Sequence, residues 1–313
     1  MDGILIIDKP AGFTSHDVVA RVRRALKEKR VGHTGTLDPF ATGALVMLVG
    51  RATRLAQFLS GDEKEYEAVI RFGYATDTGD ATGQPKPPAT NQETPNGDTN
   101  LWTDDEIEAA LQGLRGERLQ TPPMYSAKKV QGQKLYELAR RGQEIERKAV
   151  PVHLHQLEAL PNGGALLKQN ADGTRDLSIR VVCSAGTYIR VLAEEVAARL
   201  GTTAHLAALR RTRAGQFQLD AAIPLDQLPD KDANDFLLAP DAALSFMPFV
   251  HLSDEEARRA AQGNAVPLDR ADFKDGAFVR LRNEQGSLLA VGVYDAATRS
   301  VRPRVVIAAQ NKD

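Results

Sequence analysis

The sequence predicts an α/β protein built around a mixed sheet, followed by a small β-rich domain. Over about the first 220 residues, short apolar runs typical of strands alternate with amphipathic segments typical of helices. A proline-containing, linker-like stretch from about Leu225 to Phe246 follows, and short strand-like runs resume over 249–307. A chain of 313 residues, 42% of them hydrophobic, is long enough for one large and one small domain. We therefore expect domains at 1–240 and 245–313.

The N-terminal third supplies the first strands and helices. The apolar run Gly3–Ile7 reads as a buried strand. Thr14, with Asp17 three residues later, is a capping box that starts a helix reaching about Lys29. The same reasoning gives a strand at 44–49, a helix at 52–59 and a strand at 65–73 that carries Tyr66.

The middle and the C-terminal part are more varied. Residues 76–83 are rich in turn formers, and 84–100 form a polar, Pro- and Gly-containing surface insertion. We expect helices at 104–114, 134–141 and 187–200, and strands at 150–160 and 177–183. Residues 206–217 hold a basic cluster. In the small domain, a helix starts at Ser253, and strands cover 277–282, 288–294 and 302–308.

Composition excludes several protein classes. No run of 18 apolar residues exists, and the N-terminus lacks a basic and then apolar signal segment, so we expect no membrane span and a cytoplasmic protein. The single cysteine, Cys183, excludes an internal disulfide and a cysteine-based metal cluster. Net charge is −1, yet cations cluster, which fits either a basic face or ordinary mixed surface charge. The clusters are 21–30, 128–134, 140–148 and 210–213.

The segment from Arg30 to Gly43 is the candidate for chemistry. It places three glycines, three threonines, His33 and Asp38 between two apolar segments, a composition that no packed helix or strand requires. Pro39 restricts Asp38 to an extended or turn conformation. We expect a shaped loop that holds the Asp38 carboxylate in one orientation.

The sequence lacks the patterns of several other catalytic sites. His33 and Asp38 have no third metal-binding neighbour, and no Gly-x-Ser-x-Gly elbow is present. The glycines are not followed by the Lys-Ser/Thr of a phosphate loop, and Gly-x-Gly-x-x-Gly is absent. What remains is a carboxylate that acts as nucleophile or general base, beside a histidine able to stack on a nucleobase.

Motifs spread over about residues 1–220 resemble, in the same order, those of the TruB family of tRNA pseudouridine-55 synthases. The central motif is Gly32 to Gly43; the others are 3–10, 64–66, 76–80, 121–127, 136–142, 184–190 and 205–211. The resemblance implies the pseudouridine synthase fold, with a central mixed, largely antiparallel sheet and flanking helices. More weakly, the C-terminal module resembles the PUA-type RNA-binding domain that often ends these enzymes.

The resemblance also implies an activity. The family converts uridine 55 of the tRNA T-loop to pseudouridine, with no cofactor and no metal, by moving the link between uracil and ribose from N1 to C5. Asp38 matches the catalytic aspartate, which attacks either ribose C1′ or uracil C6. The implied partner is tRNA, contacted at the T-loop and the acceptor and T arms. We expect a monomer with no obligatory protein partner.

The remaining site residues are assigned by the same resemblance. Arg190 matches the arginine that pairs with the aspartate and is expected to lower its pKa. Tyr66 matches the tyrosine that stacks on the target base and could also act as general base, while Tyr188 and Leu209 match residues that wall the uracil. His33 matches the residue that fills the stack when the uridine flips out. From pattern alone, each of these side chains would pass for core packing or surface.

Cations are expected to hold the RNA backbone, partly through a thumb-like insertion at about 120–150. The predicted contacts are Lys9, Lys64, Lys128, Lys129, Arg140, Arg141, Arg210 and Arg211. Two rivals stay open: a synthase of the same family that modifies another RNA, and a non-catalytic factor that binds or folds tRNA.

Overall fold

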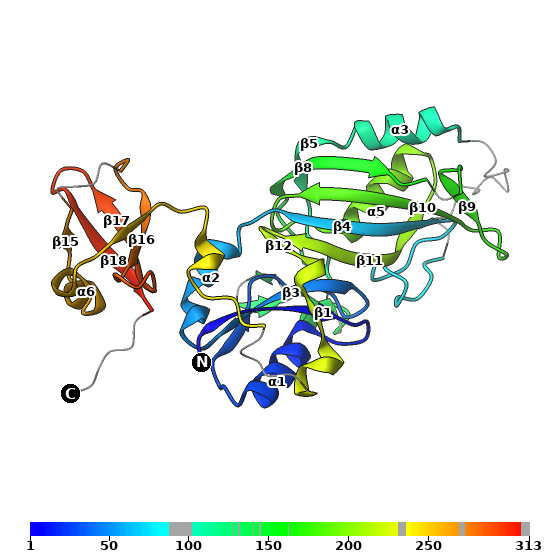
Figure 1. Cartoon of the computed structure of the whole chain (residues 1–313). Coiled ribbons are helices and arrows are strands. Elements are labelled where there is room, and N and C mark those ends of the chain that lie inside the picture. Colours follow the sequence, from blue (N-terminus) through cyan, green and yellow to red (C-terminus); the bar gives the residue numbers. More distant parts are fainter. Residues whose placement is uncertain are drawn as a thin grey trace.

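The computed structural model describes residues 1–87, 102–126, 128–130, 132–139, 141–143, 145–161, 163–230, 236–268 and 273–307. Figure 1 shows two sheets of very different size, with the small one, coloured orange to red, at the C-terminal end. Residues 88–101, which include most of the predicted surface insertion, lie outside the described residues.

The large sheet joins eleven strands of the described chain in a mixed, mostly antiparallel arrangement. Its main path runs β13-β1-β3-β11-β4-β10-β8-β5, and only β1–β13 and β3–β11 pair in parallel. This confirms the predicted fold class. The strands are β1 Gly3–Lys9, β2 Val31–His33, β3 Thr42–Val49, β4 Lys64–Phe72, β5 Gly116–Gln120, β8 Val150–Ala159, β9 Leu167–Gln169, β10 Arg175–Cys183, β11 Ala204–Ala214, β12 Phe217–Gln218 and β13 Ile223–Pro224.

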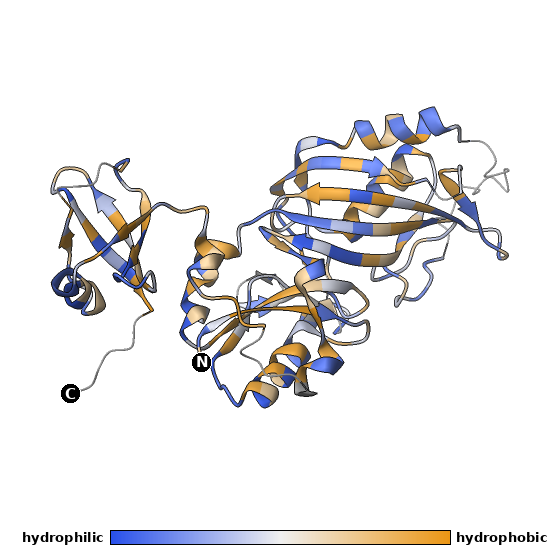
Figure 2. Ribbon diagram, viewed as in Figure 1, coloured by the Kyte–Doolittle hydropathy of each residue, from blue (hydrophilic) through white to orange (hydrophobic). Residues whose placement is uncertain are grey.

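Strands β1 and β3 are mostly apolar because both of their faces are covered. Leu5 and Ile7 of β1 enter one core with helices α1 (Ser15–Leu26), α3 (Asp104–Gln112) and α5 (Ile189–Arg199). Ile4 and Ile6 enter a second core on the opposite face. Figure 2 shows this pair of strands mostly orange, while strands in the upper part of the sheet alternate in colour. That alternation marks a sheet with one solvent-facing side.

Several elements differ from the sequence prediction. Strand β11, at the centre of the sheet, had no element assigned because its basic residues interrupt the apolar pattern. The helix expected at 52–59 is a 3-10 helix, η1 (Gly50–Leu55), that continues into the short α2 (Ala56–Leu59). The basic helix expected at 134–141 is shorter, α4 (Leu135–Ala139), and follows a hairpin of β6 (Lys129–Val130) and β7 (Gln133–Lys134).

The C-terminal part forms its own five-stranded sheet, as its β-rich pattern predicts. Its elements are β14 Phe249–His251, α6 Asp254–Ala261, β15 Val266–Pro267, β16 Phe278–Arg282, β17 Leu288–Asp295 and β18 Ser300–Val306. The linker-like stretch before it contains the 3-10 helices η4 (Leu225–Asp230) and η6 (Ala242–Leu244); η3 (Leu219–Ala221) precedes η4.

The small domain packs against the α2 region rather than hanging free. Val291 and Val305 share the second core with Leu55 and Leu59. In addition, Arg54 Nη1 donates a 2.8 Å hydrogen bond to the Val306 carbonyl. The two sheets are therefore joined by apolar contacts close to the N-terminal strand.

Gly43 is required by the pairing of β3 with β11. Its φ is +102°, and a Cβ there would lie 2.2 Å from the Arg211 carbonyl oxygen. We expect Gly43→Ala to lower the free energy of unfolding by about 3 kcal/mol or more, because both strain and a backbone clash must be relieved. Thermal unfolding followed by circular dichroism measures the loss.

Gly12→Ala is the matched control. Gly12 also has a positive φ, +85°, but a Cβ there meets nothing within 4 Å. Only the conformational cost of about 1–2 kcal/mol should appear. Equal losses in the two variants would contradict the proposed clash.

Candidate active site

Asp38 lies in the turn that links β2 to β3. Ser15, the first residue of α1, fixes this turn from one side: its Oγ donates to the Leu37 carbonyl at 3.1 Å and accepts from the Leu37 N–H at 2.9 Å. The Asp38 carbonyl accepts from the Ala41 N–H at 3.1 Å. The backbone on both sides of the carboxylate is thus held, as the composition of the loop predicts.

Two buried cations, Lys9 and Arg211, hold the same loop from beneath. Lys9 Nζ donates to the carbonyls of Phe13 and Pro39 at 2.7 and 3.3 Å. Arg211 donates to the carbonyls of Gly35 and Ala44 at 3.2 and 2.7 Å. Since each buried carbonyl needs a donor, these side chains replace the backbone partners that an irregular loop lacks.

Three of the predicted RNA contacts, Lys9, Lys64 and Arg211, are buried in the free protein, and Lys64 and Arg211 line the cavity beside Asp38 that is described below. Their residues are only 0%, 6% and 2% exposed. Lys64 Nζ points inward and donates to the carbonyls of Ser60 and Asp62. The sequence shows that each of these residues is a cation. It does not show that backbone carbonyls accept the hydrogen bonds of the side chain.

Arg190, in the first turn of α5, binds Asp38 directly. Its Nε lies 3.0 Å from Asp38 Oδ2. The other guanidinium nitrogens donate to the carbonyls of Thr78 and Tyr125 at 2.8 and 2.6 Å. Nη1 also lies 3.6 Å from Oδ2 of Asp80. The guanidinium is thus fixed by four partners and offers Asp38 one rigid donor.

Burial has a larger effect on Asp38 than the sequence analysis expected. Desolvation raises the pKa of the Asp38 carboxyl above its ordinary value, Arg190 lowers it, and the Asp80 carboxylate raises it. The net direction is upward, although Arg190 contributes the expected lowering. Removing a carboxylate from water disfavours its charge more than one neighbouring cation compensates.

A cavity of about 250 Å³ opens beside Asp38 and collects the predicted substrate residues. Tyr66 from β4, Tyr188 at the start of α5 and Leu209 from β11 line it together with Asp38 and Arg190. The register of the sheet brings them together, because Tyr66 lies opposite Arg211 of β11 and Val181 of β10. The cavity combines aromatic and aliphatic walls with one carboxylate, as a flat nucleobase requires.

Tyr66 is neutral in this environment. Burial raises the pKa of its hydroxyl, and Arg211, which hydrogen bonds to it, opposes the rise. Because the ordinary value is already near 10, a phenolate is scarce at neutral pH. Stacking on a base is therefore the role that the free protein supports for Tyr66.

His33 lies in an adjoining cavity of about 750 Å³ that shares Asp38 and Arg190 with the first. Its ring meets that of His16 edge to face, 5.9 Å between centroids. Its buried Nδ1 has no hydrogen-bond partner in the described chain. Burial, with His16 and Arg211, lowers the pKa of His33. A neutral, planar ring at the wall of the cavity fits a stand-in for a flipped base.

The remaining predicted RNA contacts differ in how far the structure describes them. Arg210 forms an ion pair with Asp8, with 2.7 Å between Nη2 and Oδ2. Lys128 is half-buried and Arg141 is exposed. Lys129 lies in β6, but the position of its side chain lies outside what the structure describes, as does all of Arg140.

Two site residues were missed by the sequence analysis. Asp80, in the turn-rich 76–83 segment, faces Arg190 and is almost fully buried. Gln120, at the end of β5, donates to the Tyr188 carbonyl at 3.2 Å and accepts from the Tyr188 N–H at 2.7 Å. Both residues lie inside or beside motifs that resemble those of the TruB family. That resemblance is the only feature of the sequence that points to them.

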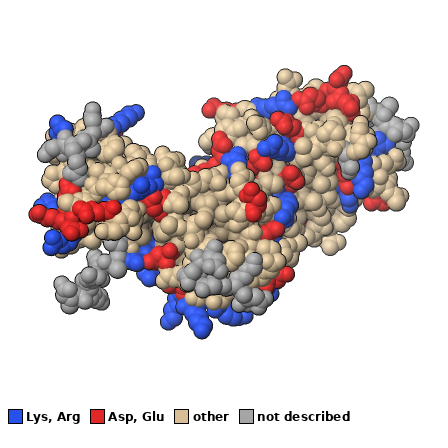
Figure 3. Space-filling view, viewed as in Figure 1, with Lys and Arg blue, Asp and Glu red and all other residues tan. Residues whose placement is uncertain are grey.

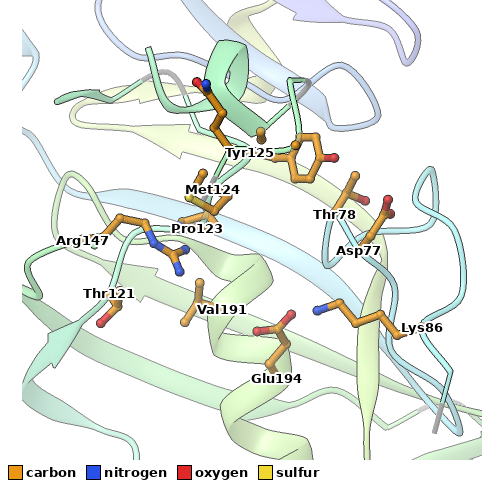
Figure 4. A pocket seen from close by; sticks show the side chains of 13 residues that line it. Asp77, Thr78, Lys86, Thr121, Pro123, Met124, Tyr125, Arg147, Val191 and Glu194 are labelled. Atoms are coloured by element: carbon orange, nitrogen blue, oxygen red, sulfur yellow. The ribbon is translucent and has the colours of Figure 1, made fainter. Parts of the chain in front are cut away.

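A third cavity, of about 560 Å³, lies beyond Tyr125. Figure 4 shows the Lys86 ammonium pointing toward the Glu194 carboxylate across it, with Tyr125 at the opposite rim. Tyr125 and Thr78 line both this cavity and the one at His33. The two residues whose carbonyls bind Arg190 therefore also line both cavities.

Family models match nearly the whole chain. The model described as the TruB family pseudouridylate synthase N-terminal domain matches residues 23–189. The tRNA pseudouridylate synthase B C-terminal domain matches 190–243, and the C-terminal model of pseudouridine synthase II TruB matches 248–307. The chain belongs to the TruB family. It is therefore an isomerase of the pseudouridine synthase class.

Relatives and solved structures agree with this family. The chain is 40% identical to the tRNA pseudouridine synthase B of Solibacter usitatus, over 93% of this chain and 95% of that one. It is 44% identical to the enzyme of the same name from Geobacillus thermodenitrificans, over 86% of both chains.

Among solved structures, an H/ACA RNP bound to a substrate RNA containing 2′-deoxyuridine matches with a TM-score of 0.71. The match has 23% identity and covers 99% of this chain and 86% of that one. A Cbf5-Nop10-Gar1 complex matches with a TM-score of 0.68 and 26% identity, over 98% and 85% of the two chains. These matches show that the fold is shared.

The described residues hold neither a group of metal-binding side chains nor a membrane-spanning helix. No group of three or more His, Cys, Asp or Glu side chains there is placed to hold a metal ion. None of the described helices combines the length and apolar character needed to cross a membrane.

Lys9 gives the loop a pH-dependent stability that can be measured. Burial lowers the pKa of Lys9 to about 8 from an ordinary 10.5. Between these values the unfolded chain binds a proton that the folded chain does not, so the contribution of Lys9 to stability grows as pH rises. We expect the stability advantage of the parent over Lys9→Met to increase by about 1–2 kcal/mol from pH 7.5 to 9.5.

Urea unfolding at both pH values measures this advantage. The comparison with Lys9→Met cancels the titration of other groups such as Cys183, whose pKa burial raises to about 11. An advantage that stays constant or shrinks with pH would contradict the assignment of Lys9 as a buried cation.

Proposed function

We propose that this protein converts uridine 55 in the T-loop of tRNA to pseudouridine, through a covalent adduct with Asp38. The observation that carries the proposal is the pairing of Asp38 with Arg190 at a cavity of about 250 Å³ walled by Tyr66, Tyr188 and Leu209. The names of the relatives supply the RNA, because both are tRNA pseudouridine synthases B.

The isomerisation needs one nucleophile, and it transfers the bond of ribose C1′ from uracil N1 to uracil C5. In one route an Asp38 oxygen bonds to ribose C1′ while the C1′–N1 bond breaks, and its electron pair leaves with uracil. In the other, the oxygen adds to uracil C6, and the C1′–N1 bond then breaks with its electron pair going to N1. In either route the base turns, C1′ bonds to C5, the Asp38 bond breaks, C5 loses its proton and N1 gains one. No electrons are gained or lost overall, so the isomerisation balances without a redox partner.

The other residues contribute by holding the reacting groups in place. Arg190 keeps the carboxylate oriented and favours its ionised form. Tyr66 and Tyr188 hold the base in the plane needed for its rotation, and Leu209 closes the apolar wall. His33 occupies the space that the flipped uridine leaves in the stack, which offsets part of the unstacking energy of a few kcal/mol.

Asp38→Asn tests the chemistry. We expect it to abolish pseudouridine formation while leaving the Kd for tRNA within a few-fold, because the amide keeps the shape but is no nucleophile. Release of tritium from tRNA carrying 5-tritiated uridine measures the product, and filter binding measures the affinity.

Asp105→Asn, a carboxylate on the exposed surface of α3, is the matched control and should keep full activity. Tritium release by Asp38→Asn would contradict the mechanism. If the parent protein released no tritium from tRNA, a non-catalytic tRNA-binding factor would be favoured. If pseudouridine formed in another RNA instead, a synthase with a different substrate would be favoured.

The pH profile tests the electrostatics of the pair. We expect Arg190→Gln to lower kcat/KM by about 100-fold or more and to move its acid limb to higher pH, because the Asp38 pKa rises further without the guanidinium. Asp80→Asn should move the acid limb the other way, because it removes a carboxylate that raises the same pKa.

Tritium release between pH 5 and 8 measures both shifts. Arg190→Lys is the control: it keeps the charge but loses the fixed fork, so it should lower the rate with a smaller shift of the limb. Acid limbs that coincide in all variants would mean that Asp38 does not set the pH dependence.

A further inference from the structure

The outer face of α1 and the turn after it form a basic surface that the predicted RNA contacts do not include. Between residues 21 and 30 the sequence has six cations and one carboxylate, Glu28. All six cationic residues are exposed. We call this surface the α1 ridge; its residues are Arg21, Arg23, Arg24, Lys27, Lys29 and Arg30. Figure 3 shows blue side chains gathered at the lower edge of the molecule, where Figure 1 places α1.

Little of this charge is neutralised within the described chain. The only ion pair of the ridge there joins Arg30 Nε to Glu28 Oε1 at 3.8 Å. Arg21 lies over the Phe13 ring, 4.4 Å from its centroid, and Arg23 donates to the Val31 carbonyl at 3.0 Å. These contacts direct the side chains but leave their charge available for an anionic partner. A local excess of positive charge attracts polyanions.

The ridge is continuous with the active site. Thr14, Ser15 and His16, at the start of α1, line the cavity that also contains Asp38 and His33. His16, Arg23 and Lys27 follow one another at intervals of seven and four residues, so they share one side of the helix. At 1.5 Å per residue this line is about 17 Å long. The ridge therefore extends from the rim of this cavity to positions beyond the nucleotide that would be held at Asp38.

We propose that the α1 ridge binds the phosphate backbone of the same tRNA, at a part of it outside the stem-loop that carries the target uridine. The inference rests on the proposed function for the identity of the RNA. The ridge lies outside the base-binding cavity, so it contributes affinity and orientation but no base recognition. Each phosphate neutralised releases counterions, which makes the contribution strongly salt-dependent.

The test neutralises the three ridge cations whose side chains make no hydrogen bond or ion pair within the described chain. The variant combines Arg24→Gln, Lys27→Asn and Lys29→Gln; asparagine suits position 27 because its φ is +50°. We expect its Kd for full-length tRNA at 0.1 M salt to rise by about 10-fold or more, and the slope of log Kd against log salt to fall by about 2–3. For the isolated T-arm stem-loop, the Kd and kcat should stay within about two-fold of the parent.

Two controls separate charge from structure. Arg24→Lys, Lys27→Arg, Lys29→Arg keeps every charge and should bind both RNAs as the parent does. Lys168→Gln removes one exposed cation on β9, far from α1, and should change neither Kd nor slope. Circular dichroism of each variant establishes that the fold is intact.

The remaining outcomes overturn the proposal. An unchanged Kd and slope for full-length tRNA would mean that the ridge serves another partner or none. An equal loss for the stem-loop would mean that it acts on the loop itself. Failure of the proposed function is seen separately, as a parent that binds tRNA but releases no tritium, because the ridge is measured by binding.

Discussion

The structure depends on how the irregular loop around Asp38 satisfies its backbone. A turn between β2 and β3 cannot use the ladder of a sheet, so its carbonyls need other donors. Lys9, Arg211 and Ser15 provide them from three separate elements, β1, β11 and α1. The orientation of one carboxylate is therefore coupled to the relative placement of the central sheet and the first helix.

The same arrangement sets the electrostatics of the site. Burying Lys9 and Arg211 under the loop places positive charge beside Asp38 and Tyr66, and it lowers the pKa of His33 together with burial. Burial of Asp38 itself acts in the opposite direction and raises its pKa. Arg190 lowers the pKa of the same carboxyl, and Asp80 raises it. The pKa of Asp38 is therefore sensitive to each neighbouring charge.

The sequence allowed the loop, its aspartate and the main fold class to be predicted, because these depend on local composition and on ordered motifs. The partners Tyr66, Tyr188, Arg190 and Leu209 came from resemblance, and the register of β4, β10 and β11 explains why they meet. Strand β11 was not assigned, since Arg210 and Arg211 break its apolar alternation. Lys9 and Arg211 were taken for surface cations because a basic residue in a motif looks the same whether its donors face phosphate or backbone carbonyl. Asp80 and Gln120 act through contacts across more than 60 residues of sequence, which no local pattern reveals.

The division of the cations into two groups explains how a chain with a net charge of −1 can act on RNA. Lys9, Lys64 and Arg211 donate to backbone carbonyls and contribute to the field at the site, whose cavity Lys64 and Arg211 also line. The exposed cations of the α1 ridge have almost no acidic neighbour within the described chain, so their charge acts outward. Attraction to phosphate over a Debye length of about 10 Å depends on such local excess and not on the sum over the whole protein. Total charge therefore says little about nucleic-acid binding here, whereas the burial of each cation decides whether it serves the loop or the RNA.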